Sequence, residues 1–194
     1  MEETIKIGGE FKEGYMGGTA WTGNNYHGYM RYSEINKIVK KAFRAKYPET
    51  KVSCTGSSFS GGQECTGTII SKLNETVYSL EEFMARAKEK GYYPNAYWYY
   101  VDGECIFHES QKLTYEIKLE SVYKSYVKNL IGFSGCIERT IDEFDELILK
   151  PEIVERLRYL KGLYDSFNDY DVNGQVDYFD VMFYESIHLQ CTQD

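Results

Sequence analysis

Residues 51–70 read KVSCTGSSFSGGQECTGTII and favour two β-strands joined by a glycine turn. Small and β-branched residues fill both flanks, and Gly61-Gly62 suits the turn between them. A turn centred between Phe59 and Ser60 would place Cys54 opposite Cys65, close enough for contact across the pair. We expect both cysteines to be reduced thiols. The segment therefore predicts an antiparallel sheet assembled from hairpins.

A basic amphipathic helix is predicted immediately before this hairpin, from Ser33 to Lys46. Its apolar positions recur at helical spacing, Ser33 is the expected cap, and Pro48 ends the element. The opposite face carries the basic residues Lys37, Lys40, Lys41, Arg44 and Lys46. Such a stripe is typical of a solvated helix face, and it is also the one place where a phosphate backbone could dock.

A second helix and a second hairpin are predicted after the glycine turn. Ser79 and Glu82 have the spacing of a capping box, and Gly91 is a typical exit residue, so a helix is expected over about residues 80–90. Asp102-Gly103 then favours a tight turn between a strand at 97–101 and a strand at 104–108.

The C-terminal half predicts further helices. In residues 114–132 the apolar residues first alternate, as in a strand, and then recur every three to four residues, as in a helix. We therefore expect a strand that runs into a helix. A capping box from Thr140 to Glu143 predicts a helix ending near Leu149, and Pro151 suits the first turn of the next one.

Together these elements predict an α+β fold, with a mainly antiparallel sheet built from hairpins and packed against three to five helices. Residues 1–31 are rich in glycine and aromatic residues and show no helical period. They predict an N-terminal arm or hairpin, with short extended segments at 4–7 and 18–22. Residues 32–194 are expected to form a single α+β domain.

Charge and length limit the classes of function. The 194 residues contain 30 acidic and 22 basic residues, a formal net charge of −8, which argues against broad nonspecific binding to nucleic acid. Basic protein grooves are better partners, although moderate acidity can also serve solubility alone. No apolar run approaches the roughly 20 residues of a membrane span, and the start lacks the pattern of a signal peptide. We expect a soluble cytoplasmic protein without a membrane partner.

Tyrosine is unusually frequent, with 19 residues in the chain. Tyrosine is common in half-buried strands. It is also common in recognition surfaces, because its side chain joins an apolar ring to a polar hydroxyl group. Phe59 at the hairpin tip, together with Tyr97 and Tyr99 in a predicted strand, are candidate aromatic contacts with nucleic acid or a partner protein. The basic candidates for the same role are Lys37, Lys40, Lys41 and Arg44.

No catalytic residue is predicted. His27, His108 and His188 lie in unrelated segments, and none is part of a recognisable nucleophile motif. The five cysteines lack the close spacing of a zinc site. The sequence therefore favours a binding protein over an enzyme and predicts no cofactor.

Residues 169–180, DYDVNGQVDYFD, support two interpretations. As a calcium loop, the side chains of Asp169, Asp171, Asn173, Asp177 and Asp180 would supply oxygen ligands, and the same carboxylates could hold magnesium for phosphodiester cleavage. Three features argue against calcium. The last ligand is aspartate where glutamate is usual, the sequence has one such loop where calcium loops usually occur in pairs, and apolar residues alternate after the loop as in a strand. The segment is better interpreted as an acidic turn that leads into the final strand.

Two segments resemble a known family. The basic helix, Pro48, the strand at Lys51-Val52-Ser53 and the turn at 57–62 are similar to the domain associated with large polyvalent proteins of phages and conjugative elements. The residues at 176–184 are similar to the closing strand of that family. The chain departs from the pattern at 67–70, where the family usually has a tryptophan.

The resemblance implies a protein of a mobile genetic element that acts in a bacterial host cell. Small proteins of this kind often inhibit host defence, so it implies an anti-CRISPR protein that binds a bacterial CRISPR effector or its guide-RNA complex. The acidity of the chain suits that role. The alternatives are a metal-dependent nuclease or nucleic-acid-binding module that acts on guide RNA or DNA, and a calcium-binding regulatory protein.

Overall fold

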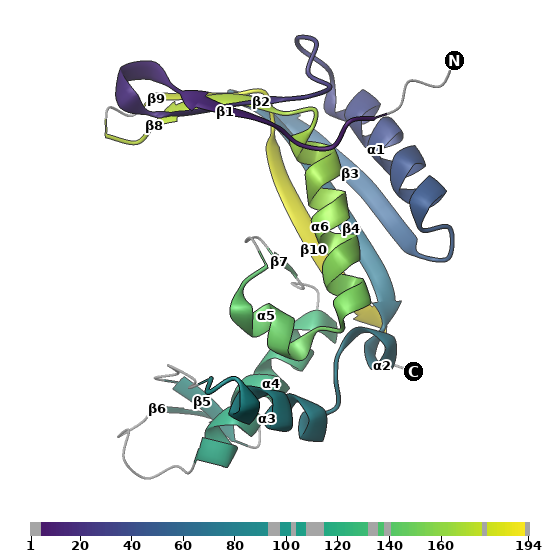
Figure 1. Ribbon diagram of the computed structural model, residues 1–194, viewed down its shortest axis with the longest axis vertical. Coiled ribbons are helices and arrows are strands. Elements are labelled where there is room, and N and C mark those ends of the chain that lie inside the picture. Colours follow the sequence, from purple (N-terminus) through teal and green to yellow (C-terminus); the bar gives the residue numbers. More distant parts are fainter. Residues whose placement is uncertain are drawn as a thin grey trace. The chain divides into compact units, whose positions relative to one another are not determined.

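The computed structural model describes residues 5–92, 98–101, 104–107, 115–131, 136–137, 141–175 and 178–192. Within these ranges helices are combined with antiparallel sheets, which confirms the predicted α+β class (Figure 1). The described ranges contain six α-helices, and one of them, α2, is only four residues long. The chain forms two compact units. Unit 1 is Met1–Ile70, Cys136–Arg139 and Glu155–Leu189; unit 2 is Ser71–Gly135, Thr140–Val154 and Gln190–Asp194.

The larger sheet of unit 1 has the strand order β3-β4-β10-β7. Its strands are β3 (Lys51–Phe59), β4 (Gly62–Lys72), β10 (Tyr184–Thr192) and β7 (Cys136–Ile137). Burial alternates along β4, where Gln63, Cys65, Gly67 and Ile69 are buried and the residues between them are not. One face of the sheet therefore carries the core, as expected for a half-buried antiparallel sheet.

Two helices cover this buried face, α1 (Tyr32–Lys46) and α6 (Pro151–Asp165). Gly67 lies directly under α6, since a Cβ atom there would be 2.8 Å from a ring carbon of Tyr164. The Tyr164 hydroxyl donates a hydrogen bond to the side-chain oxygen of Asn36 (2.8 Å), and the Asn36 amide donates to the carbonyl of Thr55 (2.7 Å). This buried chain of hydrogen bonds joins α6, α1 and β3 in one core.

The predicted helix before the hairpin is confirmed, but its predicted cap is wrong. Arg31 is the N-cap residue, with extended backbone angles, and Ser33 lies inside the first turn. The backbone N–H of Tyr32 donates to the side-chain oxygen of the buried Gln63 (2.8 Å). Since β4 supplies this acceptor, the backbone N–H of the first helical residue has a hydrogen-bond partner without a serine cap.

The hairpin at 51–70 is confirmed, with a register that differs from the predicted one. Phe59 pairs with Gly62, so the turn consists of Ser60 and Gly61, and Gly61 has a positive φ of 116°. Cys54 consequently lies opposite Gly67, and the predicted pairing of Cys54 with Cys65 is wrong. Both cysteines are free thiols.

A second sheet of unit 1 has the strand order β1-β2-β8-β9. Its strands are β1 (Gly9–Glu13), β2 (Thr19–Gly23), β8 (Asp169–Asn173) and β9 (Tyr178–Val181). The N-terminal segment thus contains a hairpin, although its first paired strand begins at residue 9 rather than in the segment 4–7. Residues 169–173, expected as a turn, are a strand, because β2 and β9 pair with them on both sides.

Unit 2 begins with α2 (Leu73–Thr76) and α3 (Leu80–Glu89). The capping box is confirmed: the Ser79 side chain accepts from the backbone of Glu82 (3.3 Å), and the Glu82 carboxylate accepts from the backbone of Ser79 (2.9 Å). Gly91 has a φ of 64°, as expected of a glycine that ends a helix.

The second predicted hairpin is also confirmed. It consists of β5 (Trp98–Val101) and β6 (Glu104–Phe107), and Val101 pairs with Glu104. The predicted turn at Asp102-Gly103 lies outside the described residues.

The segment predicted as a strand running into a helix is one helix, α4 (Tyr115–Ile131). Tyr115, Leu119, Tyr126 and Leu130 recur at helical spacing. Tyr115 and Leu119, which alternate with their neighbours as in a strand, are also four residues apart and so fit this helical pattern. Tyrosines of α4 make contacts within unit 2, and the Tyr126 hydroxyl donates to the Asp145 carboxylate (2.7 Å).

The next helix is α5 (Glu143–Ile148), and its N-cap lies two residues after the predicted cap, Thr140. Asp142 is the N-cap residue and accepts from the backbone of Asp145 (2.9 Å), while the Asp145 carboxylate accepts from the backbone of Asp142 (3.0 Å). Thr140, the predicted cap, lies outside the described residues. Helix α6 begins at Pro151, as predicted.

Candidate interaction surface

The residues predicted as metal ligands hold the β1–β2 turn in place. Both oxygens of Asp171 accept from the backbone N–H of Tyr15 (2.9 and 3.2 Å), and the Asn173 amide donates to the carbonyls of Tyr15 (3.1 Å) and Met16 (3.0 Å). Asp169 accepts from the Thr22 hydroxyl (2.8 Å). These side chains therefore have protein partners within the sheet.

The remaining predicted ligands do not complete a metal centre among the described residues. Asp180 is exposed and pairs with Asp171 across β8 and β9, and Asp177 lies outside the described residues. Among the residues that the structure describes, no group of three His, Cys, Asp or Glu side chains is placed to hold a metal ion. Calcium and magnesium binding stay predictions.

The turn that these side chains hold is a short 3-10 helix, η1 (Tyr15–Gly17). Met16 adopts a positive φ of 50°, which is uncommon for a residue with a side chain, and Gly17 follows with 80°. The backbone N–H of Gly14 donates to the carbonyl of Gly18 (2.9 Å). Tyr15 and Met16 are 52% and 69% exposed, so a fixed turn presents two large side chains to solvent.

The β1-β2-β8-β9 sheet has one mainly apolar face, which also carries Glu13 and Thr19, and one face with four carboxylates. One row of paired residues across the four strands is Phe11, Trp21, Tyr170 and Val181. Val172, two residues along β8, lies on the same face because side chains alternate along a strand. Phe11 is 66% exposed and contacts Trp21 edge to face, with ring centroids 4.6 Å apart. We call these five residues the apolar face.

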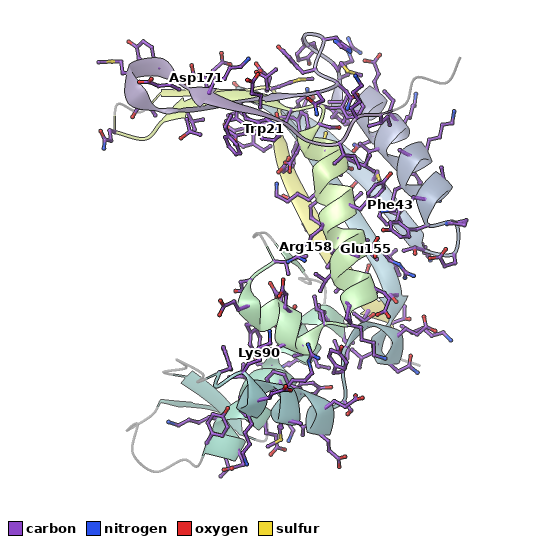
Figure 2. All side chains as sticks on the ribbon, viewed as in Figure 1. Trp21, Phe43, Lys90, Glu155, Arg158 and Asp171 are labelled. Atoms are coloured by element: carbon purple, nitrogen blue, oxygen red, sulfur yellow. The ribbon has the colours of Figure 1, made fainter. Side chains whose placement is uncertain are left out.

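The opposite face of the sheet is acidic. Lys12, Ala20, Asp171 and Asp180 form one row of paired positions, and Glu10, Thr22 and Asp169 form the next. Lys12 lies 3.4 Å from Glu10. We call the four carboxylates of this face the acidic face: Glu10, Asp169, Asp171 and Asp180. Figure 2 shows Trp21 and Asp171 at different places on this sheet.

A cluster of charged side chains lies where the apolar face meets α6. Lys161 binds Asp165 (2.8 Å) and Glu185 (2.5 Å), and the indole of Trp21 donates to the carbonyl of Asp165 (2.9 Å). Burial, and then the neighbouring Asp165, raise the pKa of Glu185 to about 7. Burial lowers the pKa of Lys161, but the attraction of Glu185 and the hydrogen bonds to Asp165 and Glu185 together outweigh burial, so this pKa is raised. One lysine thus serves two carboxyl groups.

The predicted basic stripe lies on one face of α1. Lys37, Lys41 and Arg44 are exposed and Lys40 is half-buried, at spacings of three and four residues that align side chains on a helix. Lys46 forms an ion pair with Glu155 (3.3 Å). Lys37, Lys40 and Arg44 therefore lie together on this face of the helix.

The structure does not bring Phe59 together with this stripe. Phe59 is 50% exposed and lies near Tyr184, with ring centroids 6.0 Å apart. Its odd position in β3 places it on the sheet face opposite the buried face that α1 covers. Tyr97 and the side chain of Tyr99 lie outside the described residues.

Sequence reasoning missed the apolar face, the η1 turn and the Glu185 cluster. The only local signal for the cluster was Lys161 and Asp165 at positions i and i+4 of a helix. The two faces depend on pairing between segments about 150 residues apart, and a local pattern does not reveal such pairing.

Comparisons with models of known protein families, with curated proteins and with solved structures found no match. No helix among the described residues is long and apolar enough to cross a membrane.

Proposed function

We propose that the protein is an inhibitor of bacterial defence that is encoded by a mobile element and acts in the host cytoplasm. It binds a CRISPR effector or its guide-RNA complex through the β1-β2-β8-β9 sheet. The observation that carries this proposal is the exposure of Phe11 on the apolar face and of Tyr15 and Met16 in the turn that Asp171 and Asn173 hold. The resemblance to the domain of phage and conjugative-element proteins supports the biological setting.

The exposed apolar side chains suit the centre of a protein interface. Aromatic residues and methionine are enriched in interface cores, and a few such residues usually carry most of the binding energy. Asp171 and Asn173 already fix the turn that carries Tyr15 and Met16. A turn that is ordered before binding loses less conformational entropy in the complex.

The acidic face suits a partner with a basic groove. Glu10, Asp169, Asp171 and Asp180 share one face with Lys12, and the net negative charge of this face attracts a channel that is built to hold nucleic acid. Complementary charge mainly raises the rate of association and its dependence on salt. Added salt is therefore expected to slow binding, while the apolar contacts limit dissociation.

The test is a pull-down against a panel of purified CRISPR effectors, each with and without guide RNA, followed by a DNA-cleavage assay. The wild-type chain is expected to bind one effector and to protect target DNA. Phe11→Ser combined with Met16→Ser should weaken that binding by about tenfold or more. Phe59→Ser is the matched control, because Phe59 is also half-exposed but lies on the other sheet. Failure to bind any effector would contradict the proposal.

A nucleic-acid-binding module is the second candidate, and the exposed basic stripe of α1 favours it. In this case guide RNA alone should bind, and replacement of Lys37, Lys40 and Arg44 by glutamine should reduce both the affinity and its salt dependence. Fluorescence anisotropy with labelled RNA distinguishes the two candidates. Incubation with magnesium reports any nuclease activity in the same samples.

A further inference from the structure

We propose that the protein forms a symmetric dimer in which β1 of one chain pairs antiparallel with β1 of a second copy. The two β1-β2-β8-β9 sheets then join at their edges into one continuous sheet. Pairing of strands across a free sheet edge is a common mode of protein association. The inference goes beyond the proposed function, because it concerns a second copy of this chain and the edge of the sheet rather than its faces.

Strand β1 is an edge strand, since β2 is its one neighbour in the sheet among the described residues. Four of its five residues, Glu10 to Glu13, are exposed. An exposed edge strand presents backbone N–H and C=O groups that can pair with another chain. β1 contains no proline, so each of its residues keeps a backbone donor.

The odd-numbered residues of β1 direct these backbone groups away from β2. The backbone N–H of Asn24 donates to the carbonyl of Gly8 (2.9 Å), and that of Gly14 donates to the carbonyl of Gly18 (2.9 Å). These bonds lie just beyond either end of the β1–β2 ladder. Pairs with and without hydrogen bonds alternate along an antiparallel ladder, so the even-numbered residues of β1 bond to β2 and the odd-numbered ones point to the free edge.

These outward groups make β1 complementary to itself. When Phe11 lies opposite Phe11 of the second copy, Gly9 of each chain lies opposite Glu13 of the other. Each of these pairs exchanges two backbone hydrogen bonds, because every member points its N–H and C=O groups to the free edge. A two-fold axis through the Phe11 pair relates the two chains, which is the commonest symmetry of protein dimers.

The charges of β1 select this register. Glu10 of each chain lies opposite Lys12 of the other, in pairs without backbone hydrogen bonds, where side chains approach most closely. Within one chain the same two side chains already lie 3.4 Å apart, so the dimer joins them into a cluster of alternating charge. A shift of the register by two residues places Glu10 opposite Glu10, or Lys12 opposite Lys12, and like charges in these positions are destabilising.

The same register extends the apolar face across the dimer. Phe11 is 66% exposed, although its ring contacts Trp21. In the dimer the two Phe11 side chains lie opposite each other on one face, and each covers part of the other. The row of Phe11, Trp21, Tyr170 and Val181 then continues into the same row of the second copy. An exposed aromatic ring at the sheet edge thus gains an apolar partner.

The dimer is expected to be weak, because the paired edge is only five residues long and each chain carries a net charge of −8. Sedimentation velocity of the full chain, over roughly 5–500 µM protein, measures the equilibrium without any effector. The result is therefore independent of the proposed function. The wild type should change from monomer to dimer within this range, and a monomer throughout would overturn the proposal.

Charge reversal tests the register. Glu10→Lys and Lys12→Glu each create like-charged pairs across the dimer, so each variant alone should dimerise about tenfold more weakly or worse. An equal mixture of the two variants should associate at least as tightly as the wild type, because one chain then supplies the positive charges and the other the negative ones. Lys37→Glu is the matched control, since it changes the net charge as Lys12→Glu does but lies on the exposed face of α1. A mixture that stays monomeric, or a control as weak as Lys12→Glu, would overturn the pairing.

A proline at an outward position tests the backbone bonds. Glu13→Pro removes an N–H that points away from β2, so the β1–β2 ladder keeps its bonds while the free edge loses a donor. Dimerisation should weaken by about tenfold or more, whereas Glu13→Ala, which keeps the N–H, should still dimerise. Circular dichroism checks the fold of both variants. Equal dimerisation of the proline and alanine variants would overturn the edge pairing.

Discussion

At the scale of single residues, Asp171 shows how an acidic motif can be structural. It pairs with Ala20 in β2 and with Asp180 in β9, and its carboxylate accepts from the backbone of Tyr15. A carboxylate that accepts backbone N–H bonds can hold a turn without a metal ion. The sequence pattern of a calcium loop and the pattern of this turn-binding strand coincide at these positions.

Asp171→Ala is expected to destabilise the chain by about 1–2 kcal/mol, because it leaves the N–H of Tyr15 without its charged acceptor. Urea unfolding with tryptophan fluorescence measures the change. Calcium should not alter the midpoint of the wild-type chain. A midpoint that rises with calcium in the wild type, and not in the variant, would support the calcium-loop interpretation instead.

Glu185 gives the chain a specific dependence of stability on pH. Its pKa is raised from 4.5 to about 7, so the folded chain holds this proton more tightly than the unfolded chain. The contribution of this group to stability is therefore fully present below about pH 4.5 and is lost as the pH rises to about 7.

Glu185→Gln should remove this loss of stability at higher pH, since the amide does not titrate and can accept from Lys161 and donate to Asp165. The variant is expected to be more stable than the wild type at pH 8, by about 1–3 kcal/mol, and equally stable near pH 4.5. Thermal unfolding over this pH range makes the comparison, with Glu10→Gln as the exposed control. A pH dependence that is unchanged in Glu185→Gln would disprove the role of this carboxyl group.

At the scale of elements, the contact between β4 and α6 depends on a glycine. A Cβ atom at Gly67 would lie 2.8 Å from Tyr164 and 2.9 Å from Leu160, and both of these side chains are fully buried. The core has no room to move them, because its packing is as dense as that of an organic crystal.

Gly67→Val is expected to destabilise the chain by about 1–3 kcal/mol through overpacking. Gly174→Ala is the control, because no atom of the described residues lies within 4 Å of its Cβ position and the substitution should be close to neutral. Chemical denaturation of both variants measures the difference. Similar stabilities for the two would show that α6 does not pack closely on Gly67.

Several elements could be predicted because their signals are local. The capping box of Ser79 and Glu82, and the pairing of β5 with β6 on either side of Asp102-Gly103, depend on neighbouring residues alone. The register at Cys54 and the cap at Arg31 could not be predicted, since a positive φ at Gly61 and an acceptor on Gln63 decide them. The candidate surface required the pairing of β2 with β8, which no local pattern contains.

At the scale of the whole molecule, the net charge of −8 and the exposed apolar groups act on different steps of binding. Charge acts over about one Debye length, roughly 10 Å at 0.1 M salt, and steers the encounter. Apolar contacts form only after the surfaces meet. We therefore expect the association rate to fall with salt and the dissociation rate to change little.

The most direct measurement of the central claim is the affinity of the chain for the CRISPR effector that it captures, in surface plasmon resonance. Phe11→Ser with Met16→Ser should raise the dissociation constant by about tenfold or more, mainly through faster dissociation, while Phe59→Ser leaves it unchanged. If neither the double variant nor an increase in salt alters binding, the β1-β2-β8-β9 sheet is not the surface that binds.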